Sequence, residues 1–258
     1  DDVVSIIKKI MKDKGLDPKM TSPAYIRNKI SNIKNEMLSK DDIVKFYNTP
    51  QDKVAEQVYY EYIEVLKKNN AVDFDDLLRL PVQLFLEHPD VLESYQDRFK
   101  YLLIDEYQDI SKARFMLLDC LRKSRDYELF CVGDDWQSIY AFSGSDITLF
   151  TRFLQLMGAG TELKITHTYR NSQELIDIAG GFVQKNSAQI RKQLVSPKHL
   201  ENPIVLEPFD DSVKPKLALA EIVEKIIGKI VDEFGPKKSI LLVGRYNYDM
   251  YWLCNTNK

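Results

Sequence analysis

The sequence predicts an α/β protein in which parallel sheets are flanked by helices and preceded by an N-terminal helical subdomain. The first 70 residues carry helical apolar patterns without a strand signal, whereas short apolar runs alternate with amphipathic segments after Asp73. Continuous apolar runs of this kind between helices are typical of parallel strands that are buried on both faces. The 258 residues, 44% hydrophobic and 29% charged, suit a soluble globular chain of one large or two modest domains.

The helical subdomain is predicted from a start signal and from the spacing of apolar residues. Ser22 can cap a helix whose first position is Pro23. Apolar side chains then recur at helical spacing in two segments, namely Ile26, Ile30, Ile33 and Met37, and Val54, Val58, Tyr62 and Val65. Two further helical patterns follow at 74–88 and 89–98, and Pro81 should kink or split the first of them.

Five apolar runs are expected to be strands. They are residues 101–105, 129–133, 163–166, 203–207 and 240–244. The glycine-containing stretch 157–162 could divide these strands between two sheets. Polar bursts follow three of the runs, at 106–109, 134–137 and 245–248. Because open α/β sheets bind ligands at the carboxyl ends of their strands, the sequence predicts a ligand site at these bursts.

Charge, hydropathy and cysteine content narrow the class of protein. The net charge is −3, but residues 1–35 hold eight basic and four acidic side chains, which form either a solvated helical face or a phosphate-contacting patch. No apolar run reaches about 18 residues and no secretory signal is visible, so no membrane partner is expected. Cys120, Cys131 and Cys254 form neither a zinc pattern nor a disulfide framework, which predicts a cytoplasmic location.

The stretch "YLLIDEYQDI" is an apolar run that ends in Asp105 and Glu106. This is a Walker B arrangement, in which Asp105 would hold Mg²⁺ through oxygen and Glu106 would orient or deprotonate a water molecule. The alternative is that Asp105 caps the following helix and Glu106 is merely solvated. Gln108 and Asp109 are expected to brace the turn after the strand.

The stretch "VGDDWQSIYAFSGSD" follows the second apolar run and adds two kinds of candidate residue. Gln137 could sense a terminal phosphate. Trp136, Tyr140 and Phe142 could stack on bases, although core or framework roles are at least as expected for Trp136 and Tyr140. Phe142 stands among small residues and is expected to be exposed.

The stretch "THTYRNSQEL" places Arg170 at a junction between a strand and a helix. Asn171 and Ser172 are expected to cap that helix, with Glu174 as a capping-box partner. An arginine at such a junction can stabilise transition-state charge on a γ-phosphate. An ordinary surface ion pair is the alternative.

Together these stretches resemble the UvrD/Rep-type DNA helicases of superfamily 1. "LLIDEYQD", "VGDDWQSIYAFSG" and "TYRNS" are similar to motifs II, III and IV of that family, and "VDFDDLL" to a segment before motif II. "GDDWQ.IY.FSG" resembles the DNA helicase IV branch most closely. The resemblance implies partial RecA-like motor domains of the P-loop NTPase type. Residues 1–70 would be a 1B-like helical subdomain, 71–162 the second part of the first motor domain and 163–258 the start of the second.

The resemblance also implies an ATP-dependent DNA helicase that uses ATP and Mg²⁺. Asp105 would bind Mg²⁺, Glu106 would be the catalytic base, Gln137 would contact the γ-phosphate or the attacking water, and Arg170 would act as an arginine finger. The family would translocate 3′→5′ on single-stranded DNA, unwind duplex junctions and work with DNA repair or recombination proteins.

DNA contacts are implied for Phe142, Tyr140 and Ser143. Many relatives carry arginine on both sides of the aromatic residue at position 142, where this chain has Ala141 and Ser143. The substitution at Ala141 puts one DNA or nucleotide contact in question.

The sequence contains no G-x-x-x-x-G-K-[ST] phosphate-binding loop. We therefore expect an internal fragment of a longer helicase, which by itself should not hydrolyse ATP. Three alternatives remain open: a metal-dependent nuclease that uses Asp105, Glu106 and Asp109 or Asp134, a helicase-like factor that acts on RNA polymerase, and a RecB-like helicase–nuclease.

Overall fold

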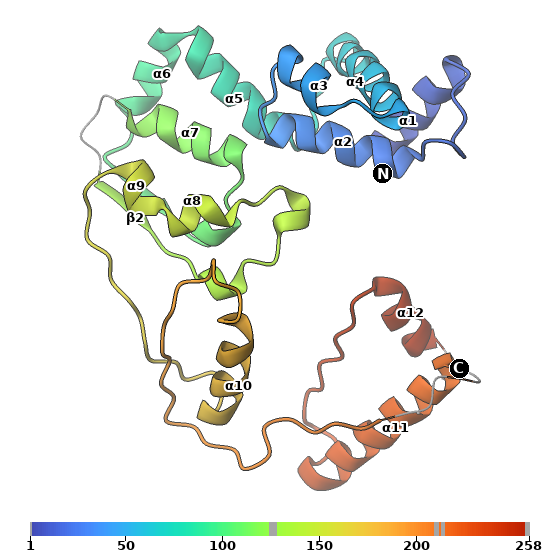
Figure 1. Cartoon of the computed structure of the whole chain (residues 1–258), viewed down its shortest axis with the longest axis vertical. Helices are drawn as coiled ribbons and strands as arrows, with labels where there is room; N and C mark the ends of the chain where they lie inside the picture. The colour runs from blue at the N-terminus through green and yellow to red at the C-terminus, as the bar shows by residue number, and fades with distance from the viewer. Residues whose placement is uncertain (1, 124–127, 209–211, 213–214, 256–258) are drawn as a thin grey trace. The chain divides into compact units, whose positions relative to one another are not determined.

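The computed structural model divides the chain into two compact units (Figure 1). The first unit comprises Asp1–His167 and Asp177–Val195, and the second comprises Thr168–Ile176 and Ser196–Lys258. The residues that the structure describes are 2–123, 128–208, 212 and 215–255. The side chain of Cys254 lies outside this description.

Helices dominate both units. The elements up to residue 157 are α1 (Asp2–Asp13), α2 (Pro23–Asn35), α3 (Lys40–Phe46), α4 (Pro50–Lys68), α5 (Asp76–Glu87), α6 (Pro89–Gln96), β1 (Tyr101–Ile104), α7 (Lys112–Arg122), β2 (Glu128–Cys131), α8 (Ile147–Thr151) and α9 (Phe153–Met157). Short 3₁₀ helices lie between them at η1 (Tyr107–Asp109), η2 (Asp135–Gln137) and η3 (Ala141–Ser143). The later helices are α10 (Gln173–Val183), α11 (Pro215–Phe234) and α12 (Asn247–Asn255).

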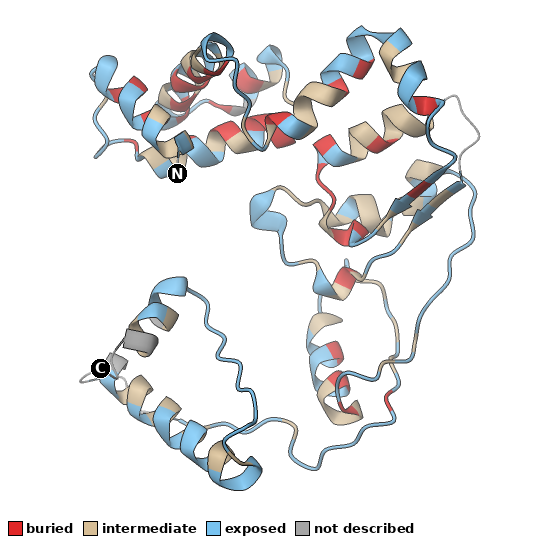
Figure 2. Cartoon of the chain, turned by 180° about the vertical axis from the view of Figure 1, so that it is seen from behind, coloured by how far each residue is buried: buried red, intermediate tan, exposed pale blue. Residues whose placement is uncertain are grey.

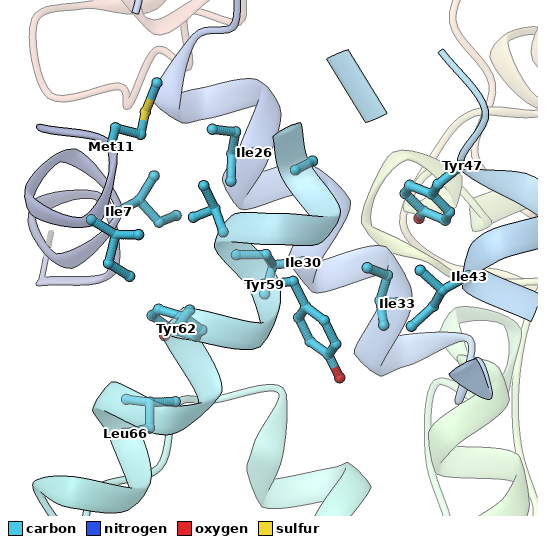
Figure 3. Packing of buried hydrophobic residues seen from close by; sticks show 13 residues of the cluster. Ile7, Met11, Ile26, Ile30, Ile33, Ile43, Tyr47, Tyr59, Tyr62 and Leu66 are labelled. Atoms are coloured by element: carbon cyan, nitrogen blue, oxygen red, sulfur yellow. The ribbon is translucent and has the colours of Figure 1, made fainter. Parts of the chain in front are cut away.

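The helices α1 to α4 enclose a hydrophobic core of their own (Figure 3). The helix α2 begins as the sequence predicts, because the Ser22 hydroxyl accepts a hydrogen bond from the Tyr25 N–H at 3.2 Å and Pro23 takes the first position. The buried core side chains include Ile7, Met11, Ile26, Ile30, Ile33, Val58 and Tyr62. Burial of each large aliphatic side chain contributes roughly 1.5–3 kcal/mol, so this cluster holds the helical region together.

A buried lysine joins this helical core to the segment that follows it. Lys34 is fully buried, and its Nζ lies 2.6 Å from Asp73 Oδ2 and 2.8 Å from Asp76 Oδ2. The Tyr62 hydroxyl donates to the same Asp73 oxygen at 2.8 Å. A charge buried this deeply is tolerated only when it is paired, so the two aspartates fix the start of α5 against α2 and α4.

The sequence predicts that Pro81 kinks or splits this helix. The helix α5 runs through Pro81 as one element, so the prediction of a split at Pro81 is wrong. Proline removes one backbone donor from the helical ladder, but Val82 and Phe85 are buried on the following turn. The helix packs along both α6 and α7, and this packing outweighs the missing hydrogen bond.

A two-stranded parallel sheet confirms the α/β class in the first unit. The pairs run from Tyr101 opposite Glu128 to Ile104 opposite Cys131. One face of the sheet packs on α7 to α9 through Leu102 and its neighbours, while Tyr101 and Leu103 on the other face are exposed. The expectation of strands buried on both faces is therefore wrong for the described residues.

The other three apolar runs, 163–166, 203–207 and 240–244, are not strands in the structure. A strand needs a neighbouring backbone to pair its N–H and C=O groups, and among the described residues only an isolated bridge between His167 and Val195 lies beside the first of these runs. Leu206 and Leu241 are each 86% exposed. Figure 2 accordingly shows little buried surface in the second unit.

The second unit begins with the cap of α10. Ser172 caps this helix as predicted, since its hydroxyl accepts from the Leu175 N–H at 3.4 Å. Glu174 is not a capping-box partner, because its carboxylate accepts from the Leu200 N–H and contacts the His199 ring, which lower its pKa to about 2. Within the described residues, no helix combines the length and apolar character that crossing a membrane requires.

Candidate functional site

The candidate site lies where β1 and β2 end side by side. Pairing continues past the strands, because the Val132 N–H donates to the Ile104 carbonyl at 2.8 Å and the Tyr107 N–H donates to the Val132 carbonyl at 2.9 Å. The polar bursts 106–109 and 134–137 therefore meet at one edge of the sheet, as the sequence predicts. The third burst, 245–248, belongs to the second unit and does not follow a strand.

Asp105 and Glu106 are both exposed directly after β1. Asp105 Oδ1 accepts the Glu106 N–H at 2.9 Å. Glu106 adopts a left-handed backbone conformation with φ 50° and ψ 41°, which is uncommon for a residue with a side chain and is found more often at functional sites. The next α-helix, α7, is capped by Ser111 rather than by Asp105, so the alternative capping role for Asp105 is wrong.

Gln108 braces this turn, as the sequence predicts. Its side chain is buried and uses both amide atoms: Nε2 donates to Glu106 Oε2 at 2.7 Å, and Oε1 accepts the Asp134 N–H at 2.9 Å. Gly133 leaves room for this amide, because a Cβ at that position would lie 2.7 Å from Gln108 Oε1. One side chain thus connects the ends of both strands.

Asp109 faces a cavity of about 460 Å³ that Asp105, Glu106 and Arg114 also line. Its Oδ1 atom is buried and has no hydrogen-bond partner among the described residues. Burial, and then the negative charge of Glu106, raise the pKa of Asp109. The cavity is therefore acidic at one end and has apolar walls formed by β1 and α7.

The loop that carries Gln137 is held by a lysine from far along the chain. Gln137 Nε2 donates to Asp134 Oδ2 at 2.7 Å. Lys192 pairs with Asp134 and lies 3.0 Å from Asp135 Oδ1. Burial alone would raise the pKa of Asp134, but the hydrogen bonds from Gln137 and Lys192 lower it.

Trp136 belongs to the framework of this loop. Its Nε1 donates to the Ile190 carbonyl at 3.2 Å, and Lys192 lies 4.8 Å from the ring centroid. The Ile190 N–H donates to Asp135 Oδ2 at 2.6 Å. The segment 189–192 therefore fixes η2 in place, and no pattern in the sequence signals this contact.

The loop after η2 exposes two aromatic rings. Phe142 is 83% exposed, which confirms its predicted exposure, and Tyr140 is 46% exposed and so is not a core residue. Their ring centroids lie 5.9 Å apart. The Ser143 hydroxyl donates to the Tyr140 carbonyl at 2.9 Å, and Gly144 turns the chain in a left-handed conformation with φ 93°.

Arg170 lies in the second unit, whereas Asp105, Glu106 and Gln137 lie in the first. Its side chain is exposed, and it forms no ion pair within the described part of the chain. Its backbone carbonyl accepts from Lys198 Nζ at 3.5 Å.

The residues present fit a magnesium ion. Asp105 is an exposed carboxylate that lines the cavity, and Mg²⁺ in nucleotide sites uses one or two carboxylates together with substrate phosphates. Asp134 is less suited to hold a metal because Lys192 and Gln137 already occupy its oxygens. Within the described residues no group of three or more His, Cys, Asp or Glu side chains could hold a metal ion, and the sequence contains no G-x-x-x-x-G-K-[ST] phosphate-binding loop.

Comparison with known families assigns the chain to a family. Residues 1–157, which include the helical core and both strand ends, match the UvrD/REP helicase N-terminal domain. The chain belongs to the UvrD/REP helicase family. The sequence resemblance is thus confirmed, while the assignment to the helicase IV branch and the three-part domain division stay predictions.

Two relatives from Bacillus subtilis carry the name of ATP-dependent DNA helicase, one of them as a putative helicase. The chain is 37% identical to the ATP-dependent DNA helicase PcrA of Bacillus subtilis over 193 residues, which are 75% of this chain and 26% of that protein. It is 34% identical to the putative ATP-dependent DNA helicase YjcD of the same organism over 224 residues, or 85% of this chain and 29% of that protein. The chain therefore spans between a quarter and a third of the length of these relatives.

Proposed function

We propose that this chain is part of an ATP-dependent DNA helicase, which couples ATP hydrolysis to 3′→5′ movement on single-stranded DNA and to duplex unwinding. The observation that carries the proposal is the hydrogen-bonded link between Glu106 and the loop that bears Gln137. That link joins Glu106 to the loop 134–137 at one sheet edge, which supports a shared role for Glu106 and Gln137. Family membership and the names of the relatives support the same activity.

Asp105 and Glu106 have separate roles in this proposal. Asp105 would hold Mg²⁺, and MgATP, when bound, would supply the phosphoryl group for transfer to water. Glu106 would take a proton from that water. Gln108 Nε2 donates to Glu106 Oε2, so the proton from the water would go to Glu106 Oε1.

Gln137 and Arg170 would respond to the terminal phosphate. The Gln137 amide is held by Asp134, so a contact between Gln137 and the phosphate would act on the loop that continues to Tyr140. Arg170 is exposed and would supply positive charge from the second unit. These two side chains would connect hydrolysis to movement.

Phe142 and Tyr140 would stack on bases of single-stranded DNA at a duplex junction. Two exposed rings side by side suit base stacking, which contributes roughly 1–3 kcal/mol per base. The Ser143 hydroxyl would act mainly by closing the turn that presents these rings, since it donates to the Tyr140 carbonyl. DNA repair or recombination proteins would be partners, and a reducing cytoplasm would suit the unpaired Cys120 and Cys131.

The test is Glu106→Gln in a full-length protein that contains this chain. We expect ATP turnover and strand separation to be lost while nucleotide binding is kept, because the amide cannot accept the proton. Glu128→Gln, at the opposite end of the sheet, is the matched control and should remain active. Normal unwinding by Glu106→Gln would refute the proposed function, and cleavage of DNA without ATP would point to a nuclease.

A further inference from the structure

Gln108 is a buried polar side chain with a fixed place between the two strand ends. It is 1% exposed, and its amide contacts Glu106 on one side and the backbone of Asp134 on the other. Its backbone carbonyl also accepts from the Ser138 hydroxyl at 3.4 Å. Because the amide donates to a carboxylate and accepts from a backbone N–H, these contacts fix its orientation as well as its position.

The Gly133 backbone approaches Gln108 closely on one side. A Cβ on Gly133 would lie 2.7 Å from Gln108 Oε1 and 2.6 Å from Phe150 Cε2, so no side chain fits between this backbone and the amide. Phe150 packs in turn on Tyr107, with ring centroids 6.2 Å apart. A side chain confined in this way can hold its two partners at a constant separation.

We propose that Gln108 is a positioning residue that holds the Glu106 carboxylate in its working orientation and ties it to the loop 134–137. The proposal rests on the proposed function, in which Glu106 is the base. Glu106 is exposed and itself adopts a left-handed backbone conformation, and Gln108 provides the hydrogen bond that restricts its carboxylate. A shift of the Asp134 backbone would pull on Gln108 Oε1 and so reach Glu106.

Two substitutions separate the contacts of Gln108. Gln108→Glu keeps an acceptor for the Asp134 N–H but sets a second carboxyl group against Glu106 in place of the amide donor, whereas Gln108→Met keeps the length and removes both contacts. In the full-length protein we expect kcat to fall about 10- to 100-fold in each variant, since a positioned base contributes about 10²–10⁴-fold. The KM for ATP should change by less than about 2-fold, because the lost interaction acts in the transition state.

The matched control is Gln96→Met. Gln96 is another buried glutamine, and its Nε2 donates to the carbonyls of Cys120 and Lys123 at 2.9 Å each, away from the site. This variant should be destabilised like Gln108→Met but should keep its kcat. An equal loss of kcat in both variants would show that Gln108 acts only through stability and would overturn the proposal.

A double-mutant cycle distinguishes positioning from general structure. If Gln108 acts through Glu106, then Gln108→Met should add less than about 2-fold to the loss already caused by Glu106→Ala. A full multiplicative loss would overturn the proposal. If Glu106→Ala itself keeps normal turnover, the proposed function fails before the role of Gln108 is reached.

A readout without nucleotide is available in the 258-residue chain. The Asp134 N–H is protected by Gln108 Oε1, so its hydrogen exchange measured by NMR should quicken at least about 10-fold in Gln108→Met and stay near wild type in Gln96→Met. Unchanged exchange in Gln108→Met would overturn the link between the two loops, whatever the ATPase assay shows.

Discussion

Lys192 should stabilise the loop 134–137 by a measurable amount. Its side chain is 17% exposed, and it pairs with Asp134 and with Asp135, whose side chain is 2% exposed. Removal of one partner from a buried pair costs about 3–5 kcal/mol. Lys192 is not fully buried and Asp135 keeps its bond to the Ile190 N–H, so we expect Lys192→Met to lower the free energy of unfolding by about 2 kcal/mol.

The assay uses Trp136, whose ring lies beneath Lys192. In a Trp252→Phe background, tryptophan fluorescence reports Trp136 alone, because the chain has two tryptophans. A loss of about 2 kcal/mol corresponds to a fall in Tm of about 4–8 °C for a chain of this size. Lys185→Met removes an exposed lysine from the same region and is the matched control, with an expected Tm close to wild type.

The pH dependence gives this prediction a second measurement. The pKa of Asp134 is lowered in the folded protein, so its contribution is present above the unfolded pKa of about 4 and is lost as pH falls through the lower folded value. The Tm difference between wild type and Lys192→Met should therefore shrink below about pH 4. A Tm within about 1 °C of wild type at pH 7 would refute the reasoning.

Two further substitutions test the aromatic loop and the helical core. Phe142→Ala should weaken single-stranded DNA binding by the full-length protein by about 1–3 kcal/mol. The control Phe74→Ala removes an 89% exposed ring elsewhere and should leave DNA binding unchanged. Equal losses of affinity for both variants in a binding titration would argue against stacking at Phe142. Lys34→Met should lower the free energy of unfolding by about 3–5 kcal/mol, because Asp73 loses its cation and Asp76 keeps only Arg79. A denaturant midpoint equal to wild type would contradict this account.

The sequence located the strand ends because their signals are local. An apolar run directly precedes Asp105 and another precedes Asp134, and parallel pairing then brings the two ends together. The same reasoning failed for 163–166, 203–207 and 240–244, since an apolar run specifies burial but not the partner strand. An apolar run forms a strand only where the backbone of a second segment pairs with its N–H and C=O groups.

The contacts that fix the candidate site are of a different kind. Gln108 acts over 26 residues to Asp134, and Lys192 acts over 58 residues to the same aspartate. Contacts between residues this far apart produce no periodic pattern in the sequence, and a lysine in a polar stretch is expected to be solvated.

Gln108 and Lys192 both contact Asp134, so a movement of one can reach the other through this residue. Asp134 gives its N–H to Gln108 and its carboxylate to Gln137 and Lys192. A displacement of the segment 189–192 would therefore move the Asp134 carboxylate, and the backbone of the same residue would carry that movement to Gln108 and on to Glu106. The candidate base and the candidate phosphate sensor are coupled through a single aspartate, so substitutions at Gln108 and Lys192 should affect each other's consequences for Glu106 rather than add independently.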